Sequence, residues 1–215
     1  MFTTLHSHHL VPFRRNGWLK LMAVGALGAW VALALHPVDR LAWLLENLLV
    51  FAGLPVLVLL HRRHPLSDLS YLLIWVFFVL HTFGTHFTYA QVPLGALVRV
   101  LGFQRNPYDR LVHFTFGLLL AYPIREWLTR SLKLRGPAAH VLALALVLAF
   151  STLYELMEWL VVVVLPRHQP AAAAFLGLQE DFWDSQKDVS MALLGAGLTS
   201  VLALLLEGRV RARGR

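Results

Sequence analysis

The chain has 215 residues, of which 58% are hydrophobic and only 14% are charged. A water-soluble domain carries about 25% charged residues, so this composition excludes an ordinary soluble globular fold. It also excludes disorder, which requires low hydrophobicity and high net charge. The absence of cysteine rules out disulfides, thiolate metal sites and cysteine nucleophiles. We therefore expect a single all-α integral membrane domain over residues 1–215.

Six apolar stretches are long enough, at about 20 residues per helix, to cross a bilayer. None of them shows the alternation of apolar and polar residues that a barrel strand has. The sequence therefore predicts a polytopic bundle of six transmembrane helices. The basic residues before the first stretch also fit a cleavable signal peptide, which would remove that helix alone. In chain order the expected helices are 18–35, 41–60, 66–86, 109–128, 138–165 and 188–207.

The basic residues predict the orientation of the bundle. Thirteen of the 19 Lys and Arg residues fall at the two termini or in the short connections on the same side of the membrane. The positive-inside rule then places both termini in the cytoplasm and the long loops 87–108 and 166–187 outside it. The basic C-terminal tail is explained as a topology anchor or a contact with anionic lipid, so the net charge of +7 does not imply a nucleic-acid partner.

Ionisable groups inside a span are costly unless they are paired, and here they gather in one layer. Five of the six expected spans place acids or imidazoles in the outer half of the membrane. Asp109 and His113 are four residues apart and share a helix face, as do Glu155 and Glu158, which are three apart. The sequence predicts an outward-facing polar pocket among the last four helices. The layer comprises Glu46, His81, His86, Asp109, His113, Glu155, Glu158, Asp181, Asp184 and Asp188.

Carboxylates and imidazoles without thiolates favour zinc, manganese, iron, magnesium or calcium as the bound ion. A metal with an open coordination position would activate water, with Glu155 and Asp184 as candidate catalytic residues. The Glu-x-x-His pairs of di-metal helix bundles are missing, and so is the HExxH motif of zinc proteases. The candidate metal ligands are His81, His86, Asp109, His113, Glu155, Glu158, Asp184 and Asp188.

Three arginines at the same depth, Arg99, Arg105 and Arg110, are candidates for binding a substrate phosphate. Apolar helices would bury the chain of a lipid-linked or amphipathic substrate. The sequence thus favours a metal-dependent hydrolase or transferase acting on an envelope lipid. Three alternatives remain open: a proton- or ion-coupled transporter, a non-catalytic membrane component whose arginines only neutralise the acids, and a haem protein with His81 and His113 as axial ligands.

Four separated motifs resemble those of the YjdF-like family of bacterial inner-membrane proteins. The resemblance covers roughly residues 41 to 206 and implies a multi-pass protein of the bacterial inner membrane, in a family without an assigned activity. Glu180 departs from the pattern, which leads us to expect a small residue there, and adds an acid beside the site. The motifs are HTFGTHFTY at 81–89, YDRLVHF at 108–114, YELMEW at 154–159 and LGLQEDFWDSQKD at 176–188.

Overall fold

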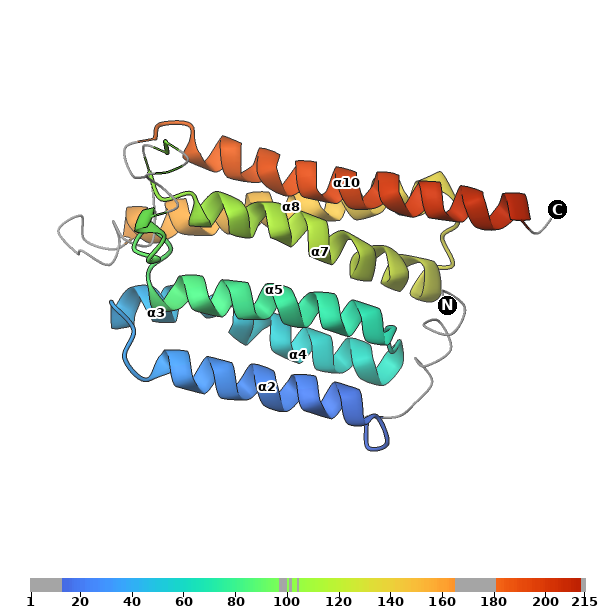
Figure 1. Ribbon diagram of the computed structural model, residues 1–215, viewed down its shortest axis with the longest axis horizontal. Coiled ribbons are helices and arrows are strands. Elements are labelled where there is room, and N and C mark those ends of the chain that lie inside the picture. The colour runs from blue at the N-terminus through green and yellow to red at the C-terminus, as the bar shows by residue number, and fades with distance from the viewer. Residues whose placement is uncertain (1–12, 97–99, 101, 104, 165–180, 214–215) are drawn as a thin grey trace.

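The computed structural model describes residues 13–96, 100, 102–103, 105–164 and 181–213. Over these residues the regular structure is entirely helical, which confirms the predicted all-α fold (Figure 1). The helices are α2 (Gly17–Ala34), α3 (Arg40–Glu46), α4 (Leu48–Arg63), α5 (Asp68–His86), α7 (Tyr108–Ser131), α8 (Pro137–Val164) and α10 (Asp184–Arg213).

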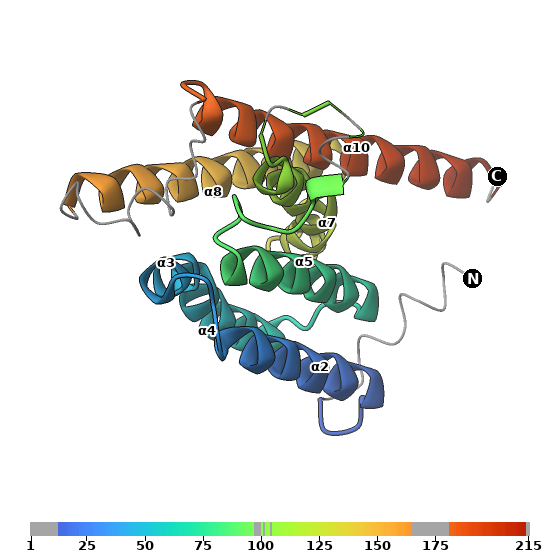
Figure 2. The same ribbon diagram turned by 60° about the vertical axis from the view of Figure 1, so that its left-hand side comes forward.

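The long helices lie side by side in two groups. Helices α2, α4 and α5 form one group, and α7, α8 and α10 form the other (Figures 1 and 2). Contacts between α5 and α7 join the two groups. The start of α2 and the end of α10 lie at the same end of the bundle, as an even number of membrane crossings requires (Figure 1).

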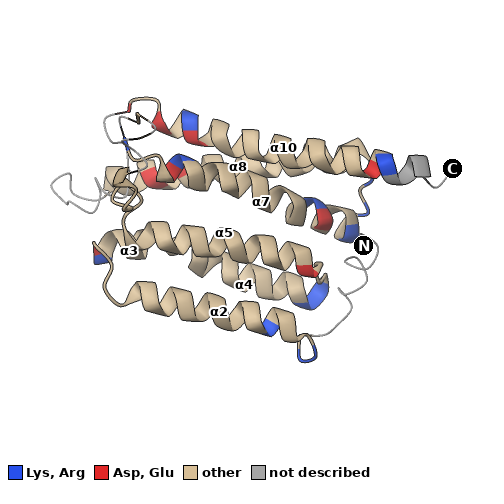
Figure 3. Ribbon diagram, in the orientation of Figure 1, with Lys and Arg blue, Asp and Glu red and all other residues tan. Residues whose placement is uncertain are grey.

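Five segments are long and apolar enough to span a membrane by themselves, with α3 and α4 counted as one. Helix α7 has the necessary length, 24 residues, but carries ionisable groups near both ends. Helix α7 contacts α5, α8 and α10, so its ionisable groups lie against other helices of the protein. The count is thus roughly consistent with the six predicted spans. Charged residues gather at the two ends of the bundle, and the middle is almost free of them (Figure 3).

The span predicted at 41–60 is interrupted at Asn47. Helix α3 ends at Glu46 and α4 begins at Leu48. The fully buried Asn47 side chain accepts a hydrogen bond from Trp30 Nε1 at 2.7 Å and donates one to the Trp43 carbonyl oxygen at 2.7 Å. The Asn47 side chain thus supplies hydrogen bonds at the point where the helix is interrupted. The residue just before the interruption, Glu46, is only 2% exposed.

At the opposite end of the bundle, the buried Glu126 of α7 caps the start of α5. Its carboxylate oxygens accept hydrogen bonds from the Ser67 amide at 3.0 and 3.1 Å, and the Ser70 hydroxyl also donates to it. Arg130 completes the arrangement with a 2.7 Å ion pair. This carboxylate has a structural role, because it accepts from the Ser67 amide and from two serine hydroxyls at the N-terminus of α5.

Helices α7 and α10 approach each other very closely through small residues. A Cβ atom added at Gly117 would overlap the carbonyl oxygen of Ala192, and one added at Gly195 would overlap that of Phe114. Close backbone approach through glycine and alanine is a common way for membrane helices to pack. This contact sets the distance between the acids in the first turns of the two helices.

We predict that Gly195→Ala lowers the thermal stability of the purified protein, because the new methyl group must push α10 away from α7. Overpacking of this kind typically costs about 1–3 kcal/mol. Gly197→Ala is the matched control on the same helix, since a Cβ there meets nothing within 4 Å. That variant should be neutral or slightly stabilising, because alanine favours helix. Equal melting temperatures for the two variants in detergent would contradict the prediction.

Candidate functional site

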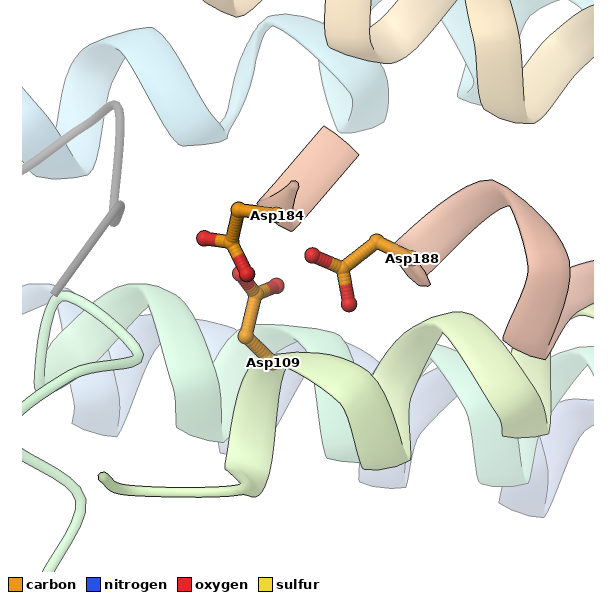
Figure 4. A group of neighbouring side chains, drawn as sticks. All are labelled: Asp109, Asp184 and Asp188. Carbon is orange, nitrogen blue, oxygen red and sulfur yellow. The ribbon is translucent and has the colours of Figure 1, made fainter. Parts of the chain in front are cut away.

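Three aspartates converge where α7 and α10 begin, at the end of the bundle that lies away from the start of α2 (Figure 1). Asp109, Asp184 and Asp188 each place one carboxylate oxygen within 4.8 Å of the others, and the carboxyl groups point toward one another (Figure 4). Asp184 and Asp188 are buried. The Oδ1 atom of Asp188 has no hydrogen-bond partner within the part of the chain that the structure describes. Carboxylates this close repel one another unless protons or cations lie among them.

His113 faces two acids of the same region. Its Nε2 atom lies 3.2 Å from Oε1 of Glu155 and 3.7 Å from Oδ1 of Asp109. Its other ring nitrogen, Nδ1, lies 3.2 Å from the hydroxyl of Ser151 on α8. A partner at the second nitrogen fixes the ring orientation, as is usual for metal-binding histidines. The shared face predicted for Asp109 and His113 therefore points into the pocket.

Two further buried acids extend the group. The Tyr154 hydroxyl donates a hydrogen bond to Glu46, which links α8 to the end of α3. Glu158 is 7% exposed and lies close enough to Asp109 and Glu155 to interact with them electrostatically. Helices α3, α7, α8 and α10 thus supply carboxylates to one buried cluster of acids.

His81 lies at the edge of this group and is held by an aromatic residue. Its Nδ1 atom is 2.5 Å from the hydroxyl of Tyr89, and burial raises the pKa of that hydroxyl well above its usual value. Tyr89 can reach the histidine because its ring lies against Gly84, where a Cβ would stand 2.7 Å from the ring. Thr88 and Tyr89 both have a φ of 52°, a left-handed conformation that is strained for such residues.

His86 does not join the other candidate ligands. Its Nδ1 atom is 2.7 Å from the carbonyl oxygen of Leu33 at the end of α2. The five-residue spacing predicted that His81 and His86 diverge, and the structure agrees. Among the eight candidate ligands, the structure gathers six into one group, namely Asp109, His113, Glu155, Glu158, Asp184 and Asp188.

Two of the three candidate arginines pair with acids at the edge of this cluster. Arg105 forms an ion pair with Asp184, and Arg110 forms one with Asp181 and lies 3.6 Å from Asp184. A hydrogen bond from Lys187 lowers the pKa of Asp181 to about 2, so this acid stays ionised at physiological pH. These contacts hold the start of α10 against α7.

A shallow groove of about 440 Å³ lies beside these ion pairs, along the first turns of α10. Trp183 lines it and is 57% exposed. Arg99, the third candidate arginine, lies outside the described residues. The groove combines two cationic side chains with apolar surface, a chemistry that suits an anionic amphiphile. Its lining residues are Arg110, Trp183, Gln186, Lys187, Ser190 and Met191.

Three site residues were not identified from the sequence: Tyr89, Ser151 and Tyr154. Ser151 lies four residues before Glu155 and therefore on the same helix face, which is a signal that spacing could have provided. Tyr154 precedes Glu155 directly and reaches a different acid, Glu46. A hydroxyl group costs less free energy to bury than a charge, so burial cost alone does not identify these three residues.

Comparison with known proteins agrees with the four motifs. Residues 18–209 match the family described as "Predicted membrane protein (DUF2238)". The chain is 42% identical over 168 residues to the "Inner membrane protein YjdF" of Escherichia coli (strain K12), an alignment that covers 77% of this chain and 78% of the relative. No solved structure gives a significant match. The chain therefore belongs to the DUF2238 family of membrane proteins, as its resemblance to the YjdF-like proteins predicted.

Proposed function

We propose that the outer pocket binds divalent metal and that the protein uses it to hydrolyse or transfer a group of an envelope lipid. The observation that carries the metal proposal is Asp188. Its carboxylate is 2% exposed, points at Asp109 and Asp184, and has an oxygen without a hydrogen-bond partner among the described residues (Figure 4). A buried carboxylate is costly unless it is paired or coordinates a metal.

The residues present fit a hard divalent cation. The oxygens of Asp109, Asp184 and Asp188 suit magnesium, manganese or calcium, and the nearby imidazole of His113 also suits iron or zinc. A bound ion of this kind lowers the pKa of a coordinated water and polarises a phosphoryl or carbonyl oxygen.

The protein's own side chains supply the other parts of such a reaction. Glu155, next to His113 and close to Asp109, is placed to accept a proton from the attacking water. Asp184 is held by Arg105 and so keeps a fixed direction as a ligand. These are the roles that we assign to the two candidate catalytic residues.

The groove beside the pocket supports an anionic amphipathic substrate. Arg110 and Lys187 offer donors for a phosphate, and Trp183 and Met191 offer apolar surface for the attached chain. The same ion pairs are what a non-catalytic membrane component would use to neutralise its acids. A chemical readout is therefore needed to separate the two functions.

Transport is a second candidate, favoured by the interruption of the span at Asn47 beside Glu46. Transporters often place ion sites at broken helices. Against it, the acids described at the opposite end of the bundle are paired within the protein: Glu126 caps α5, Asp68 accepts from Asn16, and Glu207 pairs with Arg125. Loss of a lipid-modifying enzyme changes the composition of the envelope lipids directly, whereas loss of a transporter does not.

We predict that both termini face the cytoplasm and the pocket faces outward. Because the chain has no cysteine, a single introduced cysteine reports on its own position. Phe182, 85% exposed at the pocket end, and Leu132, 54% exposed at the other end, are suitable positions. A membrane-impermeant maleimide should label Phe182→Cys in intact spheroplasts and Leu132→Cys only after permeabilisation. The reverse pattern would show that the orientation is inverted.

We predict that the purified wild-type protein contains divalent metal and that Asp188→Asn weakens its binding at least about tenfold, because even an outer-shell partner is worth 10–100-fold in affinity. Metal content is measured by elemental analysis after resupply and desalting. Asp68→Asn is the matched control, since Asp68 pairs with Asn16 at the opposite end of the bundle. Metal-free wild type, or full retention by Asp188→Asn, would contradict metal binding at this pocket.

We predict that cells lacking the protein show an altered envelope-lipid profile, which wild type restores and Glu155→Gln does not. Loss of a general base typically slows a reaction about 10²–10⁴-fold. Glu207→Gln, which changes an acid of the inner-end ion pair with Arg125, serves as the control and should complement. Complementation by Glu155→Gln would remove the catalytic role of Glu155. An unchanged lipid profile would favour the non-catalytic or transport function.

A further inference from the structure

We infer that the carboxylate of Asp181 occupies the position at which the substrate phosphate binds, and that the phosphate monoester of a lipid displaces it. This inference rests on the proposed lipid substrate. It goes beyond that proposal by assigning the phosphate position, the type of ester and an internal competitor. Asp181 lies just before α10, which begins at Asp184. Its side chain is therefore able to turn away without breaking a hydrogen bond of the helix.

Three cationic side chains converge on the Asp181 carboxylate. The Nζ atom of Lys187 lies 2.7 Å from Oδ2 of Asp181, and Nη2 of Arg110 forms an ion pair with the same oxygen. The Nη1 atom of Arg105 lies 3.8 Å from it. Guanidinium and ammonium groups that meet at one point are a usual way for proteins to bind phosphate. The site thus has the cations of a phosphate site, with a side chain of the protein as the anion.

Arg110 offers a further donor that its contact with Asp181 does not use. Its Nε atom is buried and has no hydrogen-bond partner within the described stretches of the chain. Leaving a buried donor without an acceptor is unfavourable, so this atom points to an acceptor that binds beside it. A phosphate monoester has three terminal oxygens and a charge of about −1.5 to −2 at pH 7, whereas a carboxylate has two oxygens and a single charge. A diester also has only two terminal oxygens, so the three cations and the unused donor favour a monoester.

The assigned phosphate position lies directly beside the three aspartates of the candidate metal site. Arg105 Nη1 pairs with Asp184 and also faces Asp181. Arg110 Nη2 pairs with Asp181 and lies 3.6 Å from Asp184. Each arginine therefore bridges the Asp181 carboxylate to a proposed metal ligand. A phosphate that replaces this carboxylate is separated from Asp184 by a single guanidinium nitrogen, which places the ester next to the proposed reaction centre.

The surroundings of this position favour a lipid over a free phosphate ion. The groove of about 440 Å³ is lined by Arg110 and Lys187 and also by Trp183 and Met191. Trp183 is 57% exposed, and Phe182 beside it is 85% exposed. Exposed aromatic side chains at the end of a membrane-spanning helix typically lie at the level of the lipid headgroups. The chain attached to the phosphate therefore finds apolar surface next to the cations.

The test measures binding of dihexanoyl phosphatidic acid, a soluble lipid monoester, to the full-length protein in detergent by isothermal titration calorimetry. Asp181→Asn should bind it about tenfold more tightly than wild type, because an internal competitor that fills the site about 90% of the time weakens the apparent affinity by that factor. Asparagine keeps the Oδ1 acceptor that Asp181 offers to the Trp183 amide at 3.1 Å, so the start of α10 retains this hydrogen bond.

Asp39→Asn is the matched control. Asp39 caps α3, whose start lies at the same end of the bundle as the start of α10 (Figure 1). This variant removes one negative charge there, keeps a capping side chain and should bind the monoester as wild type does. Arg110→Gln added to Asp181→Asn should abolish the gain in affinity, because it removes donors to the phosphate. Inorganic phosphate and dihexanoyl phosphatidylglycerol, a diester, should bind Asp181→Asn more weakly than the monoester.

The outcomes separate this inference from the proposal beneath it. Equal affinity of wild type and Asp181→Asn for the monoester would overturn the inference and leave a lipid substrate in the groove. Equal or tighter binding of the diester or of inorganic phosphate would overturn the monoester or the lipid, respectively. If neither protein binds any of these compounds, the proposed lipid substrate fails as well. If Asp181→Asn fails to fold, as judged by gel filtration, Asp181→Ser replaces it, since serine also caps a helix start without a charge.

Discussion

The close contact between α7 and α10 is the constraint on which the pocket depends. Both helices repeat the same pattern, in which ionisable residues in the first turns are followed, at intervals of four, by small residues further along. Residues four apart form one ridge on a helix surface, so the ridge that carries the acids continues as the ridge that makes the contact. Because the small residues let the two backbones touch, the acids that precede them on the same ridges must also come close together. The two series are Asp109, His113, Gly117 and Ala121, and Asp184, Asp188, Ala192 and Ala196.

Helix α8 repeats the arrangement in a third copy. Glu155 and Ser151 lie above Val147 and Ala143 on the same four-residue series, and all four residues are buried. Three helices therefore divide one buried face into a polar outer part and a tightly packed inner part. The apolar packing next to the acids lowers the local dielectric and so strengthens the electrostatic contacts among them.

The sequence is sufficient to predict the helices, their approximate bounds and the polar layer, because these depend on composition and on spacing within one helix. Asp109 and His113 face the same pocket for that local reason. Contacts between helices are a different matter. That Arg105 reaches Asp184 depends on where a loop folds back, and the interruption at Asn47 is stabilised by Trp30 from another helix. Neither contact leaves a periodic signal in one sequence.

The polar ends of α7 also bear on how the protein is assembled in the membrane. Among the long helices that the structure describes, α7 does not combine length with sufficient apolarity, and α10, which covers its Gly117 ridge, follows it in the chain. A charged helix enters a bilayer at a cost that neighbouring helices must offset. Until α10 arrives, α5 and α8 are the partners that keep α7 inserted. A chain without α10 would leave both Asp109 and the Gly117 ridge of α7 without the helix that covers them.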